Sequence, residues 1–263
     1  MSLPGSFQAK KKDGTIYYRS SITYKNKHIS LGSFATDEEA HAAYVQAGKV
    51  LGDSEITLES YCADILLPFN KWVVLINFRD NNIYFNTPIY LRPKFFYYYL
   101  TQKIRLIFDI DDLFFYASHK ISQRGGHLFV ADYGMQLTIN SRYGIKNYAV
   151  LDKDYRFING NTYDYRYDNI EIINTYHGVS LSDSKTSKKY CAKIHLNGNY
   201  NIGYYETAIE AAIAYNKAID IVRRNGCIKN FSFNEMDEVS PIVYADIYSK
   251  LKVSKKITGY LPK

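Results

Sequence analysis

The same short helical pattern occurs twice in this chain. The segment TAIEAAIAYNKA, Thr207 to Ala218, repeats TDEEAHAAYVQA, Thr36 to Ala47. Each copy begins with Thr-x-x-Glu, a capping box in which the Thr side chain caps a free backbone N–H and the Glu reaches back. The alanines and the tyrosine that follow recur at helical spacing. Each copy therefore predicts a helix that packs closely on its neighbour.

The residues that precede each helix predict a small sheet. TIYYRSSITYKNKHISLGSF contains two β-rich runs joined by YKNK, and KKYCAKIHLNGNYNIGYY contains two runs joined by LNGN, which carries an Asn-Gly hairpin signal. A shorter strand is expected before each pair, at SFQAK and at GVSLSD. Each unit is thus predicted to be a three-stranded antiparallel sheet followed by one helix. Because the helix covers one sheet face, the other face is open to solvent or a partner.

Composition limits the classes of function. The 263 residues carry a formal charge of +7 and a sequence pI of about 9.0, which is compatible with a polyanionic partner. Cys62, Cys191 and Cys227 are odd in number and far apart, which argues against a disulfide framework and a Cys-type zinc site. The start, MSLPGSFQAKKKDG, lacks the apolar run of a secretory signal, and WVVLI and FFYYYL are too short to span a bilayer. We expect a cytoplasmic protein with no membrane partner.

The repeated unit resembles the Apetala-type (ethylene-response-factor) DNA-binding domain. The first copy carries that family's pattern at Ile22, Ile29, Leu31-Gly32, Phe34, Thr36, Glu38-Glu39-Ala40 and Ala43-Tyr44. The second copy carries it at Ile194, Ile202-Gly203, Tyr205, Thr207, Glu210-Ala211 and Ala214-Tyr215, and continues into GCIKNFSFN, which is similar to the family's Asn-Phe closing segment. In that family the open sheet face enters the DNA major groove, which admits a β-ribbon.

The resemblance implies which side chains would face DNA. In the first module they are Arg19, Ser21, Thr23, His28 and Ser30, with Lys10, Lys12, Lys25 and Lys27 nearby. In the second module they are Lys193, His195, Asn199 and Asn201, with Lys188 and Lys189 at the strand entrance. Plant members of the family carry several Arg and Trp residues on this face. Here most of these positions are Ser, Thr, His or Asn, so the target DNA sequence of the family does not transfer to this chain.

The segment DKDYRFINGNTYDYRYDNIEIIN, Asp152 to Asn174, resembles the core of the HNH homing-endonuclease family, and the upstream GGHLFVADYGMQLTI is similar to its preceding strand pair. HNH cleavage uses a His that activates water and an adjacent Asp that helps to hold a metal ion. This chain has Arg156-Phe157 at the Asp-His position, and neither side chain can do that chemistry. The retained residues are the turn and helix-start positions of the ββα scaffold: Asn159-Gly160, Asp164, Arg166 and Asn169-Ile170.

The loss of these groups predicts a non-enzymatic protein with no catalytic residue, no metal ligand and no cofactor. Tyr165 also replaces the family's Asn in Asp-Asn-Arg. Three histidines, His119, His127 and His177, lie near this segment in the sequence, so a displaced nuclease site remains open as an alternative.

Two other segments give weaker signals. The first is RDNN, which lies between WVVLINF and NIYFNTPIYL and is typical of a hairpin turn. The second is FDIDDLFFYA, whose Asp residues lack the Gly and terminal Glu spacing of a calcium loop and therefore favour a capped helix start. Ser240-Pro241 predicts a final helix with Val243, Ile247 and Leu251 on one side. This helix could pack on the core or join two copies of the chain, so a homodimer is possible.

The sequence as a whole predicts an α+β protein in which two sheet-helix modules flank a degenerate HNH-like centre. The expected parts are a first module (1–55), a connecting region (56–115), a central ββα domain (116–177), a second module (178–235), and a C-terminal helix with a basic tail (236–263). We expect a sequence-specific double-stranded DNA-binding protein of a bacterium or phage, nucleoid-associated in the cytoplasm, that regulates transcription. The alternatives are an active metal-dependent HNH endonuclease and a non-catalytic RNA- or protein-binding module.

Overall fold

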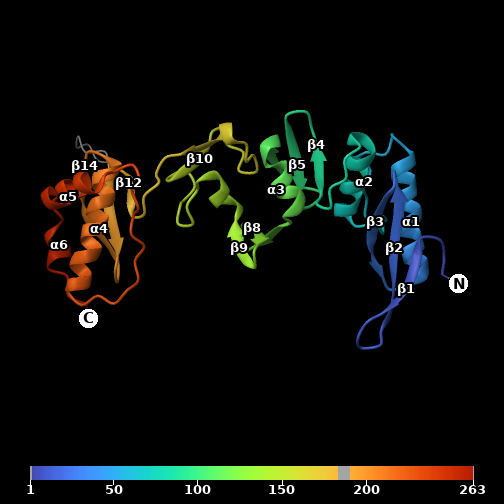
Figure 1. The fold of residues 1–263 in the computed structure, drawn as a ribbon, viewed down its shortest axis with the longest axis horizontal. Helices are drawn as coiled ribbons and strands as arrows, with labels where there is room; N and C mark the ends of the chain where they lie inside the picture. Colours follow the sequence, from blue (N-terminus) through green and yellow to red (C-terminus); the bar gives the residue numbers. More distant parts are fainter. Residues whose placement is uncertain (1, 183–189, 263) are drawn as a thin grey trace. The chain divides into compact units, whose positions relative to one another are not determined.

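The protein is a mixed α+β structure built from several small antiparallel sheets and a few helices (Figure 1). The computed structural model describes residues 2–182 and 190–262. The chain divides into two compact units, which are described separately below. Unit 1 comprises residues 1–139 and 161–169, and unit 2 comprises residues 140–160 and 170–263.

Unit 1 contains three three-stranded sheets, ordered β1-β2-β3, β4-β5-β6 and β7-β8-β9. The first sheet and its helix are β1 (Ser6–Lys10), β2 (Ile16–Tyr24), β3 (Lys27–Phe34) and α1 (Asp37–Gly52). They are followed by η1 (Leu58–Ser60), α2 (Phe69–Asn81), β4 (Ile89–Leu91), β5 (Phe95–Tyr99), β6 (Arg105–Asp109), η2 (Ile110–Asp112) and α3 (Leu113–Ser118). The remaining elements are β7 (Ile121–Arg124), β8 (His127–Asp132), β9 (Met135–Thr138) and η4 (Tyr167–Asn169), with η3 (Ile139–Tyr143) at the boundary with unit 2.

Unit 2 contains a two-stranded sheet, β10 (Tyr155–Phe157) with β11 (Ile170–Ile172), and a three-stranded sheet ordered β12-β13-β14. The three-stranded sheet is formed by β12 (Val179–Leu181), β13 (Tyr190–His195) and β14 (Asn199–Tyr205), followed by α4 (Ala208–Arg224). Two short helices, α5 (Pro241–Lys250) and α6 (Lys255–Thr258), complete the unit.

Both predicted sheet-helix modules form. In each, a helix with a complete capping box, Thr36 with Glu39 and Thr207 with Glu210, covers one face of a three-stranded antiparallel sheet (Figure 1). The alanines of the repeated pattern are buried against the sheet, because small side chains let the helix approach closely. The predicted YKNK and LNGN connections are both hairpin turns, and the predicted early strands are β1 and β12.

A β-bulge occurs at the same place in both modules. In the first module Ser20 pairs with Gly32 and Ser21 with Ser30, so Leu31 is the extra residue. In the second module Ala192 pairs with Gly203 and Lys193 with Asn201, so Ile202 is the extra residue. Leu31 and Ile202 are both buried. The Leu-Gly and Ile-Gly pairs of the sequence repeat are therefore bulges that turn an apolar side chain into the core.

A second repeated detail joins each sheet to its helix. Gly5 and Gly178 precede the first strand of their modules with φ values of +76° and +73°. A Cβ at Gly5 would lie 2.1 Å from Tyr44 Cγ, and a Cβ at Gly178 would lie 2.4 Å from Tyr215 Cδ2. The chain thus passes directly over the tyrosine of the repeated Ala-Tyr pattern, and only glycine fits there.

The predicted hairpin around RDNN is wrong. WVVLINF belongs to α2, a helix of 13 residues that ends at Asn82 in the left-handed conformation. A short apolar run does not distinguish a buried strand from a buried helix, and this one is buried on all sides. Leu67, Trp72 and Leu75 share one core with Ile29 and Leu31 of the first module, so the first module and α2 pack as one body.

The central region differs from the predicted ββα arrangement. The upstream strand pair forms as β8 and β9, and β10 pairs with β11 as the second hairpin. The expected helix start at Asn169-Ile170 is wrong, because Ile170–Ile172 is a strand, and residues 140–178, all described, contain no α-helix. The alternating Ile170 and Ile172 pair with Phe157 and Tyr155, which favours a strand over a helix at this point.

The other two predictions of helix positions are confirmed. η2 and α3 begin within FDIDDLFFYA, but neither is capped by an Asp side chain. The Asp109 carboxylate accepts a hydrogen bond from Tyr167 N (2.7 Å), and the Asp112 carboxylate accepts one from Tyr167 Oη (3.2 Å). Ser240 caps α5 through Val243 N, with Pro241 in the first turn. Of the three residues predicted on its apolar side, Ile247 and Leu251 pack on the core of unit 2, whereas Val243 is exposed.

Candidate nucleic-acid interface

The side chains predicted to face DNA in the first module lie on one face of its sheet. Directly opposed residues of neighbouring antiparallel strands share a face, and the structure pairs Ser21 with Ser30 and Thr23 with His28. Arg19 alternates with Ser21 on the same strand and is therefore on that face as well. Arg19, Thr23, His28 and Ser30 are exposed and Ser21 is half-buried. We call this set of five residues face 1.

Two aromatic residues next to face 1, Tyr17 and Phe7, were missed by the sequence reasoning. Tyr17 accepts hydrogen bonds from Arg19 Nε (3.1 Å) and Arg19 Nη2 (2.7 Å), and so holds the guanidinium along the sheet. Phe7 is the direct cross-strand partner of Arg19 and is 56% exposed. The alternation of side chains along β1 and β2 could have placed both residues there.

The four lysines expected near face 1 do not lie together. Lys10 and Lys12 are exposed, at the end of β1 and in the turn that follows. Lys25 donates a hydrogen bond to Asn82 Oδ1, and Lys27 Nζ lies 4.9 Å from the centre of the Tyr84 ring. Lys25 and Lys27 therefore contact the end of α2 and the loop after it, because the turn of the β2–β3 hairpin packs there.

The predicted residues of the second module also share one sheet face. Lys193 pairs with Asn201 and His195 pairs with Asn199, and the His195 Nδ1–Asn199 Oδ1 distance is 2.9 Å. Asn201 Oδ1 is buried and has no hydrogen-bond partner among the residues that the structure describes. We call these four residues face 2. Lys188 and Lys189, also predicted to contact DNA, lie outside the described residues.

Face 2 differs from face 1 at the position of Arg19. Counting from the shared bulge, Cys191 occupies that position in β13, where it pairs with Tyr204. Cys191 is buried, and burial raises the pKa of its thiol. The two modules thus share the bulge and the strand pairing, but face 1 has an arginine where the second module has a buried cysteine.

The charge distribution favours an anionic partner on these faces. None of the six strands of the two modules contains Asp or Glu. The carboxylates Asp37, Glu38 and Glu39 lie in the first turn of α1, on the layer that covers the opposite side of the sheet. The strands themselves therefore present only cationic and neutral groups to an approaching ligand.

The segment that resembles the HNH core holds its side chains by ordinary structural contacts. Arg156 Nε lies 2.5 Å from its cross-strand partner Glu171, and Arg166 Nη2 lies 2.6 Å from the buried Asp164. Phe157 and Tyr165 are buried. Phe157 has no group that can accept a proton, and the Arg156 guanidinium is already protonated at neutral pH.

The three nearby histidines occupy separate environments. His119 stacks on Phe115, with its Nε2 3.4 Å from Asp132 Oδ1. His127 is exposed. His177 packs edge-on between Tyr148 and Tyr215, and burial lowers its pKa. Within residues 2–182 and 190–262, no three His, Cys, Asp or Glu side chains gather in a group that could hold a metal ion.

Comparison with known proteins gives no match to a protein-family model, a curated protein or a solved structure. Among the described residues, no helix is long and apolar enough to cross a membrane.

Proposed function

We propose that this chain binds double-stranded DNA sequence-specifically through face 1 and face 2, as a regulator of transcription derived from an HNH homing endonuclease that has lost catalysis. The observation that carries the proposal is the duplicated module. Both copies share the capping box, the bulge and the glycine–tyrosine contact, and both leave a polar sheet face without carboxylates.

The dimensions and chemistry of these faces suit a DNA groove. A two-stranded ribbon fits the major groove, where Arg can donate two hydrogen bonds to guanine and Asn can pair with adenine. Arg19 is held in an extended position by Tyr17 before any ligand arrives. Ordering this side chain in advance reduces the entropy lost on binding.

The loss of catalysis predicts that the purified protein does not cleave duplex DNA. We expect no nicking of plasmid or linear duplex with magnesium, manganese or zinc, because Phe157 stands at the general-base position and is buried. Agarose-gel assays over a range of protein concentrations measure this. Metal-dependent nicking that scales with the pure protein, and that disappears with His119→Ala or His127→Ala, would establish the endonuclease alternative.

The salt dependence of binding should report contacts from each face. We expect Arg19→Ala and Lys193→Ala each to reduce the slope of log affinity against log salt by about one, because each removes one cation from the phosphate backbone. Fluorescence anisotropy at several salt concentrations measures the slope. Lys49→Ala is the matched control, because Lys49 is exposed near the end of α1, in the helical layer. If Lys49→Ala alters the slope and the other two substitutions do not, DNA contacts the helices.

A further inference from the structure

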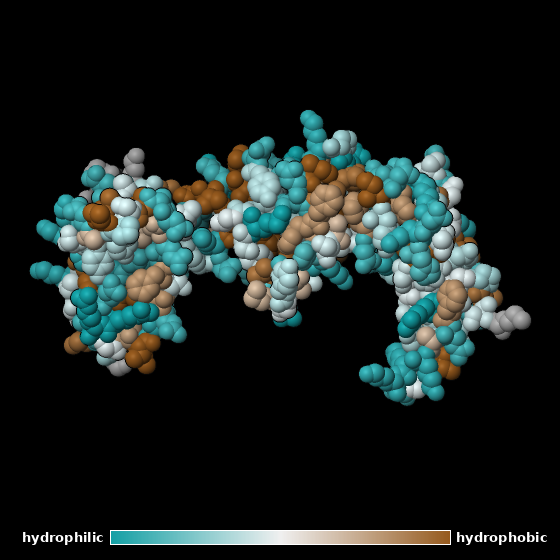
Figure 2. Space-filling model, viewed as in Figure 1, coloured by the Kyte–Doolittle hydropathy of each residue, from teal (hydrophilic) through white to brown (hydrophobic). Residues whose placement is uncertain are grey.

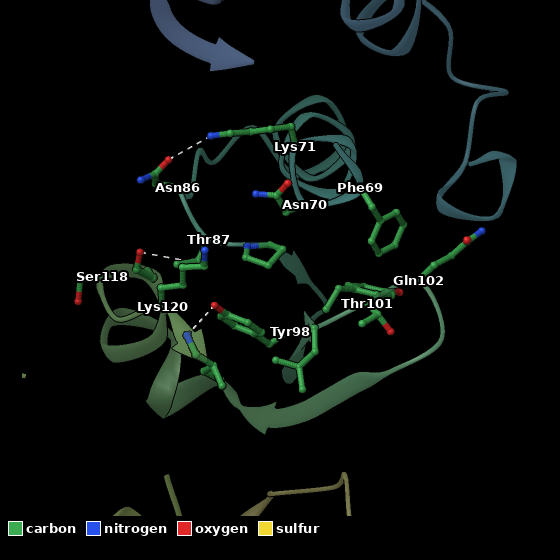
Figure 3. A pocket seen from close by; sticks show the side chains of 15 residues that line it. Phe69, Asn70, Lys71, Asn86, Thr87, Tyr98, Thr101, Gln102, Ser118 and Lys120 are labelled. Atoms are coloured by element: carbon green, nitrogen blue, oxygen red, sulfur yellow. Dashed lines mark hydrogen bonds between the residues drawn. The ribbon is translucent and has the colours of Figure 1, made fainter. Parts of the chain in front are cut away.

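Unit 1 contains a cavity of about 700 Å³ between the start of α2, the segment before β4, the end of β5 and the α3–β7 junction (Figure 3). This volume lies within the range of about 300–1,000 Å³ that is typical of small-molecule sites. The lining combines polar groups such as Asn70 and Thr101 with apolar surface from Phe69, Pro88 and Ile121.

Two lysines lie at one end of this cavity. Lys71 and Lys120 both line it, on the side opposite Phe69 in Figure 3. Burial and the positive charge of Lys120 lower the pKa of Lys71. Among the described residues, the Lys71 ammonium makes one hydrogen bond, a long one of 3.4 Å to Asn86 Oδ1, and the Lys120 side chain has no hydrogen-bond or ion-pair partner. No Asp or Glu lines the cavity, so two like charges face the same space without a counter-charge.

A buried hydroxyl adds a donor to the floor of the cavity. Tyr98 is 1% exposed, and its Oη accepts a hydrogen bond from Ile121 N at 2.9 Å. Burial raises the pKa of Tyr98 to about 12, so the hydroxyl keeps its proton at neutral pH. That proton has no acceptor among the described residues, and a buried donor without an acceptor is costly. An acceptor supplied by a ligand would satisfy it.

The start of α2 contributes further donors. Pro68 stands at the N-cap and offers no capping side chain. The backbone N–H groups of Lys71 and Trp72 bond to Pro68 O, whereas those of Phe69 and Asn70 have no backbone acceptor within the described part of the chain. Phe69, Asn70 and Lys71 all line the cavity, so the positive end of this helix favours an anion there.

We propose that this cavity binds a small phosphorylated molecule, with its phosphate between Lys71 and Lys120 and its remaining atoms along Phe69 and Pro88. A phosphate dianion neutralises both ammonium groups, which bind phosphate as point charges. None of the residues that line this cavity belongs to face 1 or face 2. The site is thus distinct from face 1 and face 2, and the proposal does not depend on DNA binding.

Isothermal titration of the full chain with adenosine monophosphate, adenosine and inorganic phosphate tests the proposal. We expect saturable binding of adenosine monophosphate, weaker binding of inorganic phosphate, and much weaker binding of adenosine. K71Q and K120Q should each weaken adenosine monophosphate binding about tenfold, because each removes one charged hydrogen bond. K103Q is the matched control, because Lys103 is exposed in the neighbouring turn and does not line the cavity.

Several results would overturn the proposal. The first is that neither adenosine monophosphate nor inorganic phosphate binds at millimolar concentration. The second is that adenosine binds as tightly as adenosine monophosphate. The third is that K71Q, K120Q and K103Q weaken adenosine monophosphate binding equally. Loss of duplex DNA affinity in K71Q and K120Q, with adenosine monophosphate affinity unchanged, would assign the lysines to DNA. Thermal unfolding of the unliganded variants checks their folding. Because Lys120 is exposed, we expect K120Q to perturb the fold less than K71Q.

Discussion

Replacing Gly5 with alanine should lower the free energy of unfolding of unit 1 by about 3 kcal/mol. The left-handed φ of +76° costs an L-residue about 1–2 kcal/mol, and the new Cβ, 2.1 Å from Tyr44 Cγ, adds an overlap of about 1–3 kcal/mol. The segment cannot swing away freely, because Leu3 N donates to the Asp37 carboxylate at 3.0 Å and Ser21 N donates to Gly5 O at 3.1 Å.

Urea unfolding followed by tryptophan fluorescence measures this effect. Trp72 is the only tryptophan of the chain and is buried in the core that the first module shares with α2. Gly14→Ala is the matched control, because Gly14 also has a positive φ, +91°, but its nearest neighbour would lie 3.7 Å from the new Cβ. The control should cost about 1–2 kcal/mol from backbone strain alone. Equal costs for the two variants would show that the contact with Tyr44 does not constrain the chain.

Removing the side chains of either face should weaken binding to a selected DNA fragment by about a hundredfold or more. When two modules bind one duplex, the second contact is intramolecular, so the loss of either one removes the gain in avidity. The module-one variant carries Arg19→Ala, Thr23→Ala and His28→Ala. The module-two variant carries Lys193→Ala, His195→Ala and Asn199→Ala. Anisotropy titrations at fixed salt measure the affinities.

Substitution of the face is a cleaner experiment than truncation of residues 1–55. Ile29 and Leu31 pack with Leu67, Trp72 and Leu75 in one core, so truncation would expose the apolar side of α2. The substituted side chains lie on the face opposite this core, and circular dichroism can check that the fold is kept. If the module-one variant binds as tightly as the unchanged protein, the first module makes no important DNA contact.

The repeated modules were predictable from the sequence because local signals and packing agree there. Thr-x-x-Glu and the alanine spacing favour the same helix in both copies, an Asn-Gly turn favours the hairpin of the second copy, and the paired residues of each face follow from strand alternation. The shared bulges at Leu31 and Ile202 account for the Leu-Gly and Ile-Gly repeats, whose reason the sequence alone does not reveal.

Other parts depend on contacts that the sequence does not encode locally. Whether WVVLINF is a strand or a helix is decided by its burial on all sides against the first module. The positions of Lys25 and Lys27 depend on how the hairpin turn meets Asn82 and Tyr84. The cavity lined by Lys71 and Lys120 is formed by four separate segments of the chain, and no sequence motif indicates it.

A footprint of the unchanged protein and the two face variants on one selected DNA fragment tests the central claim most directly. We predict two protected segments for the unchanged protein, with different base sequences, because Arg19, Thr23 and His28 differ chemically from Lys193, His195 and Asn199. The module-one variant should lose one segment and the module-two variant should lose the other. A single protected segment, or loss of the same segment in both variants, would contradict the proposal that the two modules hold one DNA molecule together.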